Sequence, residues 1–405
     1  METKLQPALA GRPEGRRAEA VIRRCVHCGF CNATCPTFRI LGNELDGPRG
    51  RIYLIKRALE GGELSRETQI HLDRCLGCQA CETTCPSGVD YHELLDIGRA
   101  WVDARVPRPL HERARRWALR LLFGSRRLLR IVLAMGDAVR PFLPAGLRRQ
   151  VPDVAPARPW PRPVHARRML ALNGCVQPVV SPGIDVAAAR LLDAAGISLQ
   201  PAPQGCCGAM SYHLGDQREG LRQAGRRIRE WSRALDEGRE AIVITATGCG
   251  AFVRDYPRLF ADDPALAEPA RRVAAAARDI GSVLAGEELP AFEADDGSVA
   301  LHCPCTLKNA LGEDELVRRL LAACGVRLAP VTDSIACCGS AGPYSLLQPG
   351  LATRIRERKL ADLESDAPEE IVTANVGCLH HLAAGTDRPV RHWVELLADR
   401  LPEQT

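Results

Sequence analysis

Two stretches, RCVHCGFCNATCP at residues 24–36 and RCLGCQACETTCP at residues 74–86, carry the same cysteine pattern. In each, four cysteines are separated by two, two and three residues, and proline follows the last. Such a run places three thiolates around one iron–sulfur cubane, and in two-cluster proteins its fourth cysteine binds the other cluster. The repeated run therefore predicts two [4Fe-4S] clusters in one N-terminal module.

The predicted ligands form two interleaved sets. The first set is Cys25, Cys28, Cys31 and Cys85, and the second set is Cys75, Cys78, Cys81 and Cys35. Zinc is the alternative metal, but it needs only four ligands and leaves the third cysteine of each run and the repeated Cys-Pro without a role. His27 stands beside Cys28, and we expect it to be a polar loop residue because cysteine already fills all eight ligand positions.

The 39 residues between Cys35 and Cys75 contain GNELDGPRGRIYLIKRALEGG and RETQIHLDRC. Their apolar residues recur at helical spacing, which differs from a short β-rich ferredoxin. We therefore expect a helical two-cluster domain over residues 1–103.

Composition narrows the class of protein. The chain has 405 residues and 46% hydrophobic content, and no secretion signal or membrane-spanning run is recognisable, so we expect a cytoplasmic protein. In that compartment, 18 cysteines indicate metal or redox sites rather than disulfides. An aromatic content of 4% and a net charge of +5 give little reason to expect a nucleic-acid partner.

Residues 104–168 form a basic segment with 16 arginines and three acidic residues. It joins the apolar-basic stretch RRWALRLLFGSRRLLRIVLAM to the Pro-rich VPDVAPARPWPRPVHARR, which is typical of an extended linker. One interpretation is a solvated helix and linker. The other is a docking surface for an acidic partner subunit or for anionic lipid on the inner face of the membrane, formed in part by Arg126, Arg127 and Arg130.

After this segment the chain repeats itself. Three cysteine pairs, at offsets of 130, 131 and 129 residues, define the repeat: Cys175 with Cys305, Cys206 with Cys337, and Cys249 with Cys378. In each copy, short apolar runs alternate with helical stretches, and the cysteines fall where strands are expected to end. The predicted fold is thus α+β and multidomain, with the helical module followed by two α/β repeats at 169–297 and 298–405.

The repeats offer a possible further metal site. Its candidate ligands are Cys175, Cys206, Cys207, Cys249, Cys305, Cys337, Cys338 and Cys378. Four thiolates at strand ends can hold zinc or a further cluster. Cys303 and Cys324 have no counterpart in the first repeat, and we expect Cys324 to be a small buried apolar residue.

Several stretches resemble the family of bacterial glycolate oxidase (glycolate dehydrogenase) iron–sulfur subunits. Besides the two cysteine runs, they are GNELDGPRGRIYLIK at 42–56, GCCGAMSYHL at 205–214, LHCPCTLKNA at 301–310 and PVRHWVELL at 389–397. The resemblance covers nearly the whole chain and identifies the repeats as CCG (cysteine-rich) repeats. In that family's fuller pattern each repeat ends in C-x-x-C, but here Ala246 and Asn375 occupy the first of those positions.

The resemblance implies an electron-transfer subunit of an oxidoreductase complex. FAD-containing partner subunits would oxidise glycolate to glyoxylate, and this chain would pass the electrons towards a quinone-linked or other acceptor. The sequence agrees, because it has no dinucleotide-binding loop, P-loop or nucleophile set, and we assign it no catalytic residue.

Three alternatives remain open from the sequence. The complex could serve lactate or glycerol-3-phosphate instead of glycolate. The CCG repeats could themselves catalyse thiol–disulfide chemistry, as in a heterodisulfide-type reductase. A zinc-bound binding module that uses the basic segment is the third alternative.

Overall fold

The computed structural model describes residues 1–144, 148–149, 151–152, 154–162, 164–293, 296–333 and 337–402. The chain divides into two compact units. The first unit comprises residues 1–118 and 335–355, and the second comprises residues 119–334 and 356–405. Part of the predicted basic segment and linker lies outside the described residues.

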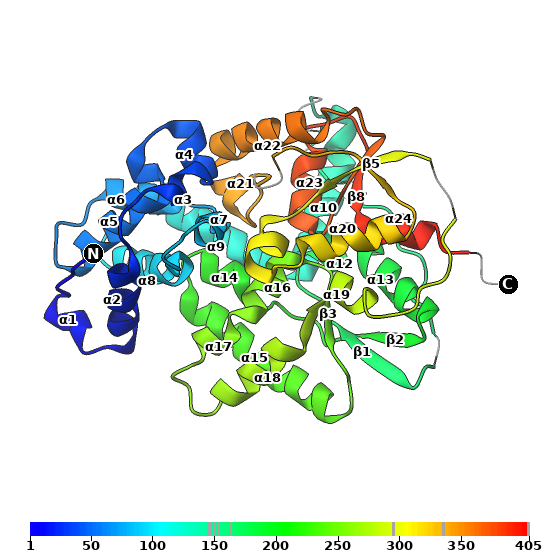
Figure 1. The fold of residues 1–405 in the computed structure, drawn as a ribbon, viewed down its shortest axis with the longest axis horizontal. Helices are drawn as coiled ribbons and strands as arrows, with labels where there is room; N and C mark the ends of the chain where they lie inside the picture. The colour runs from blue at the N-terminus through cyan, green and yellow to red at the C-terminus, as the bar shows by residue number, and fades with distance from the viewer. Residues whose placement is uncertain are drawn as a thin grey trace. The chain divides into compact units, whose positions relative to one another are not determined.

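The first unit is helical, as the sequence predicts (Figure 1). Its main elements are α1 (Pro7–Ala10), α2 (Pro13–Arg24), α3 (Phe30–Ala33), α4 (Pro36–Leu41), η1 (Glu44–Asp46), α5 (Pro48–Leu59), α6 (Arg66–Asp73), α7 (Ala80–Thr83), α8 (Tyr91–Asp103) and α21 (Tyr344–Leu347). Two longer helices, α9 (Leu110–Gly124) and α22 (Pro349–Leu363), cross the sequence boundary between the units.

Buried aliphatic side chains of α2, α5 and α8 form the core of the first unit, among them Ile22, Ile55 and Leu94. Gly98 lets α8 approach α5 closely, since a Cβ atom there would lie 2.6 Å from the side chain of Ile55. Helix ends are set locally: Pro48 starts α5, where a missing N–H costs nothing, and the Asp90 side chain caps α8 by accepting from the N–H of Glu93 at 3.2 Å. This packing holds the loops that carry the cysteines.

The second unit contains two four-stranded parallel sheets. The first consists of β1 (Arg167–Ala171), β2 (Ile197–Pro201), β3 (Ile242–Ile244) and β4 (Ala277–Asp279). The second consists of β5 (Ser298–His302), β6 (Arg327–Leu328), β7 (Glu370–Thr373) and β8 (Val390–His392). The strand orders, β2-β1-β3-β4 and β6-β5-β7-β8, are the same, which confirms the predicted duplication.

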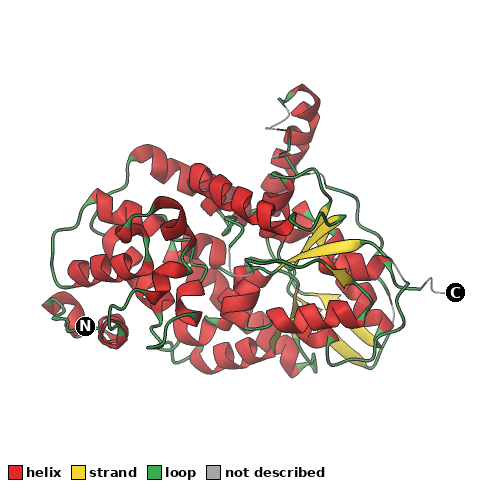
Figure 2. Ribbon diagram, turned by 45° about the horizontal axis from the view of Figure 1, so that its top comes forward, coloured by secondary structure: helices red, strands yellow, loops and turns green. Residues whose placement is uncertain are grey.

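Helices flank both sheets, as Figure 2 shows in red around the yellow strands. In the first repeat they are α12 (Gln177–Val180), α13 (Gly183–Ala194), α14 (Ala209–His213), α15 (Gln217–Asp236), α16 (Thr247–Arg254), α17 (Tyr256–Leu259), α18 (Ala267–Ala276) and α19 (Ile280–Leu284). In the second they are η3 (Thr306–Leu311), α20 (Asp314–Ala323), α23 (Val376–Ala383), α24 (Trp393–Asp399) and most of α22. Because helices cover both faces of the sheet, all three residues of β3 are apolar and buried.

The two repeats share one hydrophobic core, to which Val243 of β3, Val372 of β7 and Leu397 of α24 contribute. Polar contacts also join them. The Nε2–H of His392 donates to the carbonyl oxygen of Thr245 at 2.9 Å, and the hydroxyls of Thr247 and Thr306 lie 2.7 Å apart. The two sheets and their helices therefore pack against each other and are not independent domains.

The predicted apolar-basic stretch, residues 115–135, falls on two helices, the end of α9 and the start of α10 (Arg126–Val139), and α10 is followed by η2 (Arg140–Phe142). Arg126 does not lie on the surface of α10: it is buried, and its Nε donates to the carbonyl oxygen of Gly174 at 3.0 Å. Among the described residues, no helix combines the length and apolar content needed to cross a bilayer.

Candidate metal centres

The eight cysteines of the two runs line two cavities in the first unit. The first cavity is lined by Cys25, Cys28, Cys31 and Cys85 together with Cys81. The second cavity is lined by Cys35, Cys75, Cys78 and Cys81. Each cavity thus contains three cysteines of one run and the fourth cysteine of the other, and Cys81 lies on the wall between them.

Local backbone geometry brings the first three thiols of each run together. His27 and Gly29 have left-handed backbone conformations, with φ of 61° and 90°, and the matching residues of the second run, Gly77 and Gln79, have φ of 65° and 57°. These turns reverse the chain between cysteines. His27 is thus a left-handed turn residue in an exposed loop that also lines the first cavity, and its non-ligand role stays a prediction.

The third and fourth cysteines of each run are separated by a short helix. Cys31 lies in α3 and Cys81 in α7, and Cys35 precedes Pro36 at the start of α4. The two runs are tied together where these helices meet: the hydroxyl of Thr34 donates to the carbonyl oxygen of Ala80 at 3.1 Å. The contact keeps the two runs adjacent, in keeping with the fourth cysteine of each run lining the cavity of the other.

The donor sets suit a metal centre with a large positive charge. Burial raises the pKa of the Cys31 thiol to about 11 and raises the pKa values of Cys78 and Cys81 well above their usual range. Several thiolates confined in a buried space repel one another, so an empty set would stay protonated. A polynuclear iron core supplies the opposing charge and needs all four sulfurs, so the residues fit [4Fe-4S] clusters.

Cys75 differs electrostatically from the other buried thiols. Burial opposes its ionisation, but the charges of Arg51 and Arg99 and the N–H of Gly77 lower its pKa below the usual value. The N–H of Gly77 lies 3.4 Å from its Sγ, and the hydroxyl of Tyr91 lies 3.8 Å from the same atom. The second cavity therefore has hydrogen-bond donors and cations close to one of its predicted ligands, Cys75.

A segment of the second repeat completes the first unit. The Tyr344 hydroxyl donates to the carbonyl oxygen of Arg74 at 3.1 Å, and the Arg354 guanidinium donates to the carbonyl oxygen of Ile40 at 3.1 Å. Cys337 stands on this segment, close enough to Cys78 to help burial raise the pKa of that thiol.

The four cysteines of the first CCG repeat gather at the carboxyl edge of their sheet. Cys175 follows β1, Cys206 and Cys207 follow β2, and Cys249 lies in the first turn of α16 after β3. Side-chain hydrogen bonds link Cys175 to Cys206, Cys206 to Cys207, and Cys207 to Cys249. The expected position at strand ends is thus where they are found.

These contacts favour one thiolate among the four. Hydrogen bonds from Cys175 and Cys207, and from the N–H of Gly208 at 3.3 Å, lower the pKa of Cys206 well below its usual range. The same contact with Cys206, followed by burial, raises the pKa of Cys175. The four cysteines therefore form one linked group rather than four independent thiols.

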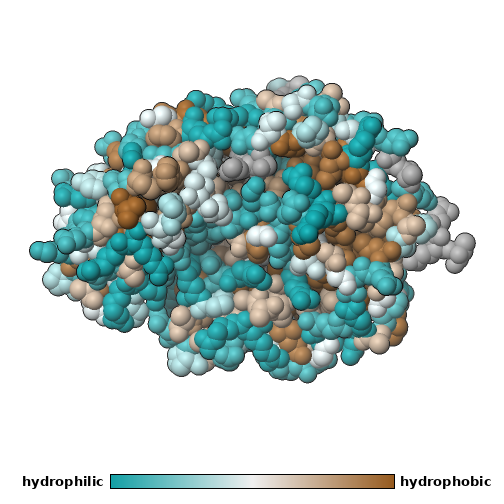
Figure 3. Space-filling view, viewed as in Figure 1, coloured by the Kyte–Doolittle hydropathy of each residue, from teal (hydrophilic) through white to brown (hydrophobic). Residues whose placement is uncertain are grey.

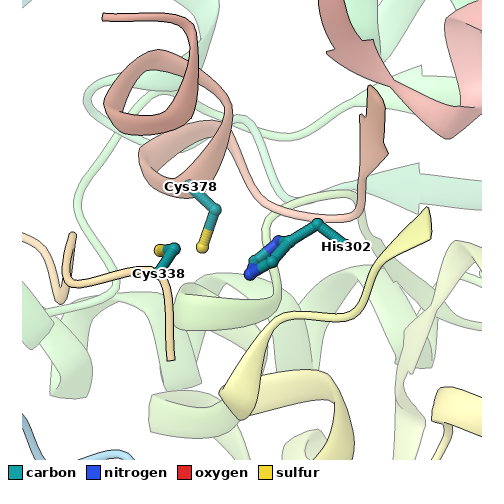
Figure 4. Close-up of side chains that lie close together, drawn as sticks. All are labelled: His302, Cys338 and Cys378. Carbon is teal, nitrogen blue, oxygen red and sulfur yellow. The ribbon is translucent and has the colours of Figure 1, made fainter. Parts of the chain in front are cut away.

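The second repeat is arranged differently. Cys305 and Cys378 belong to the second unit, whereas Cys337 and Cys338 belong to the first. His302, at the end of β5, points towards Cys378 (Figure 4), and its ring nitrogen lies within 4.8 Å of the cysteine Sγ. Sequence reasoning missed His302, although its place directly before the cysteines of LHCPC is the signal that could have found it.

Asn375, which replaces the first cysteine of the family's C-x-x-C pattern, has a local role. Its side-chain amide donates to the Sγ of Cys378 at 3.4 Å, and its oxygen accepts from the N–H of Gly248 at 3.5 Å. Burial raises the pKa of Cys303 to about 12 and that of Cys324 to about 11, so both are expected to stay neutral thiols. Cys324 packs against the core only in part.

Comparison with known proteins agrees with this geometry. Residues 21–89 match the family described as 4Fe-4S dicluster domain, and residues 169–254 and 299–383 each match the family described as cysteine-rich domain. These matches confirm the predicted fold class of a helical two-cluster module followed by two CCG repeats.

Full-length relatives carry a more specific description. The glycolate oxidase iron-sulfur subunit of Escherichia coli (strain K12) is 47% identical over 100% of both chains. The probable glycolate oxidase iron-sulfur subunit of Bacillus subtilis (strain 168) is 32% identical over 92% of this chain and 91% of its own. Lactate utilization protein A of Geobacillus thermodenitrificans (strain NG80-2) is 26% identical over 56% of this chain and 96% of its own. The full-length matches confirm the resemblance seen in the sequence, and the chain belongs to the family of glycolate oxidase iron–sulfur subunits.

Proposed function

We propose that this chain is the electron-transfer subunit of a complex that oxidises glycolate. The observation that carries the proposal is the pair of four-thiol cavities in one helical unit, with Pro48, Cys81 and Tyr91 lining both. Two redox centres that share a wall can exchange electrons directly. The choice of glycolate as the substrate rests on the family to which the chain belongs.

In this proposal, the interleaved cysteine sets hold two [4Fe-4S] clusters, which supply one-electron redox chemistry when bound. The protein contributes the dry surroundings and the hydrogen bonds to sulfur that adjust the potential, such as those from Gly77 and Tyr91 to Cys75.

Substrate oxidation belongs to partner subunits. Glycolate would give a hydride from its α-carbon to FAD on a partner and a proton from its hydroxyl to a base on that partner, which leaves glyoxylate and places two electrons on the flavin. The flavin returns them one at a time, which suits a chain with two one-electron centres. The electrons then leave for a quinone-linked or other acceptor, and no residue of this chain acts on glycolate.

Purification of the chain with its flavoprotein partner tests the proposal. We expect a brown complex with about eight irons in this chain, in which glycolate reduces the clusters in the absence of oxygen. Lactate and glycerol-3-phosphate serve as matched substrates, because the relative named for lactate utilization makes lactate the main alternative. A colourless zinc protein, or clusters reduced by lactate and not by glycolate, would overturn the proposal.

We further propose that the gathered thiols of the first CCG repeat bind a metal. Cys175, Cys206, Cys207 and Cys249 form a continuous hydrogen-bonded group, in which the neighbouring thiols lower the pKa of Cys206. Thiolates select zinc or iron–sulfur centres. The missing cysteine at Ala246 argues against heterodisulfide-type catalysis, because the family's full pattern is incomplete there.

Metal analysis of anaerobically purified protein tests this site. The double variant Cys206→Ser/Cys249→Ser should lose the metal held beyond the two clusters, and Cys324→Ser is the matched control because Cys324 stands outside the group. If wild type and the double variant contain the same eight irons and no zinc, the gathered cysteines are structural.

A third proposal concerns an apolar stripe on α10 and η2, made of Ile131, Met135, Val139 and Phe142, whose exposed fractions are 57%, 65%, 49% and 86%. Exposed Arg127 and Arg130 lie beside it on the same helix. Such a helix suits the surface of an anionic membrane, where apolar residues enter the lipid and arginines meet headgroups. On the face shown in Figure 3, apolar residues gather in several small patches separated by hydrophilic ones.

Binding to vesicles tests the stripe. Anionic vesicles should retain the protein at low salt, and Arg127→Glu/Arg130→Glu should weaken retention, whereas Arg222→Glu on α15 should not. Retention that ignores salt and charge reversal would overturn the proposal. If the charge-reversed variant still binds vesicles but no longer binds the flavoprotein, the stripe is assigned to an acidic partner subunit.

A further inference from the structure

A buried arginine lines the second cavity. Arg51 projects from α5, its side chain is only 1% exposed, and it lines the cavity together with Cys35, Cys75, Cys78 and Cys81. An unneutralised charge at such depth is costly, so its partners decide how much of the charge remains available to the cavity.

The hydrogen bonds of Arg51 go to neutral acceptors. Its Nε donates to the carbonyl oxygen of His71 at 2.8 Å, and its Nη2 donates to the hydroxyl of Thr37 at 3.1 Å. That hydroxyl also lies 3.3 Å from the Sγ of Cys35. The guanidinium is thus held in place beside a predicted cluster ligand without being neutralised by these contacts.

The nearest carboxylate is shared with other groups. Asp46 is also 1% exposed, and its Oδ1 lies 3.7 Å from Arg51 but 2.9 Å from Nδ1 of His71. Its Oδ2 accepts from Arg74 at 3.0 Å. Because Asp46 is bound more closely by His71 and Arg74, it offsets only part of the charge of Arg51.

Other charged groups around the second cavity are weaker or more solvated. Arg99 of α8 adds a second cation, since its Nη2 donates to the carbonyl oxygen of Cys75 at 2.7 Å. Glu82 of α7 opposes it, but this carboxylate is partly exposed and accepts a hydrogen bond from the N–H of His92. Around the second cavity, Arg51 is therefore less solvated than either Arg99 or Glu82.

The first cavity offers a matched contrast on the same helix. Arg49 lines it, but this side chain is 33% exposed, and its Nε contacts Oε1 of Glu44 at 2.6 Å. Water and a direct carboxylate partner both weaken the field of Arg49. Arg49 and Arg51 carry the same charge, but the charge of Arg51 acts much more strongly on its cavity than the charge of Arg49 acts on the other.

We propose that Arg51 raises the reduction potential of the cluster in the second cavity above that of the cluster in the first. Reduction adds one negative charge to a cluster, and a fixed buried cation stabilises that charge. One electron would then leave the reduced first centre, which returns to its oxidised state, and reduce the second. Arg51 is a positioning and tuning residue in this scheme, and the inference rests on the proposed cluster ligation.

Redox titration followed by paramagnetic resonance tests the proposal in the full chain. In wild type, the centre reduced first should be the one whose signal Cys75→Ser removes. In Arg51→Gln, the reduction equilibrium of that centre should fall at least tenfold, which is about 59 mV for one electron. Arg51→Lys, which keeps the charge, should shift it less. Arg49→Gln is the matched control and should leave this centre unchanged.

A second variant, with the opposite expected effect on the potential, keeps the proposal testable if Arg51→Gln misfolds. Asp46→Asn removes a nearby negative charge, so the potential of the same centre should rise. If Arg51→Gln loses its clusters, a potential that fails to rise in Asp46→Asn overturns the proposal, as does an unchanged potential in an Arg51→Gln protein with full iron content. Absence of two cluster signals in wild type would instead overturn the proposed ligation.

Discussion

The hydroxyl of Thr34 donates a hydrogen bond to the carbonyl oxygen of Ala80, at 3.1 Å across 46 residues of sequence. This contact joins Thr34, at the end of α3 within the first cysteine run, to Ala80, the first residue of α7 in the second run. It is a direct link between two runs whose fourth cysteines line each other's cavities.

Replacing Thr34 by valine keeps the shape of the side chain and removes this bond together with the longer one from the same hydroxyl to the carbonyl oxygen of Cys31 at 3.3 Å. We expect a loss of about 1 kcal/mol in the free energy of unfolding and faster release of iron to a chelator. Thr83→Val is the matched control, because the Thr83 hydroxyl donates to the same carbonyl oxygen at 3.1 Å from within the second run. Equal iron release from the two variants would contradict a special role for the contact between runs.

Interleaved ligation predicts that two cysteines of one run serve different clusters. Cys25→Ser should alter the paramagnetic signal of one reduced cluster, and Cys35→Ser that of the other, because Cys25 lines the first cavity and Cys35 the second. Cys75→Ser should reproduce the effect of Cys35→Ser. Loss of the same signal in Cys25→Ser and Cys35→Ser would show that each run binds its own cluster.

His392 predicts a loss of stability in mild acid. Burial lowers the pKa of His392 from its ordinary value of 6.5 to about 4, and its ring accepts from the N–H of Val394 at 3.3 Å while donating to Thr245. The unfolded chain therefore binds the proton first as pH falls. Its contribution is complete above pH 6.5 and is lost between pH 6.5 and about 4, by up to about 3 kcal/mol.

Denaturant unfolding of apoprotein at several pH values measures this effect. His392→Asn can still cap α24 but cannot titrate, so the variant should be less stable at pH 7 and should depend less on pH below it. His111→Gln, a change at an exposed histidine, should keep the wild-type profile. An unchanged pH profile in His392→Asn would contradict the prediction.

Gly208 supports the thiol group of the first CCG repeat. Its φ is 105°, and a Cβ atom there would lie 2.4 Å from the carbonyl oxygen of Gly220. Gly208→Ala should therefore cost about 2 kcal/mol or more and disturb the adjacent Cys206 and Cys207. Gly196→Ala is the control, because Gly196 has φ of 73° with no atom in the way and should cost only the backbone strain. Thiol accessibility to a labelling reagent, measured beside stability, should rise in Gly208→Ala alone.

Much of the fold was predictable because it is written in local patterns. Helical periodicity between Cys35 and Cys75 indicates the helical module, and the cysteine offsets near 130 residues indicate the duplication that the equal strand orders confirm. The sequence could not separate the fates of the two CCG repeats. Their cysteines have nearly the same spacing, but Cys337 belongs to the same unit as the two cavities, whereas Cys206 stays with its own sheet.

The sequence by itself determined that the first three cysteines of each run lie together. Only two residues separate one cysteine from the next, and the turns of their own loop bring the thiols close. Only the tertiary structure decided which residues surround them. Arg49 and Arg51 look alike in GPRGR, yet α5 buries one beside Thr37 and His71 and leaves the other paired with Glu44 near water. Burial depends on packing between segments far apart in the chain, and burial governs how strongly a charge acts on its neighbours.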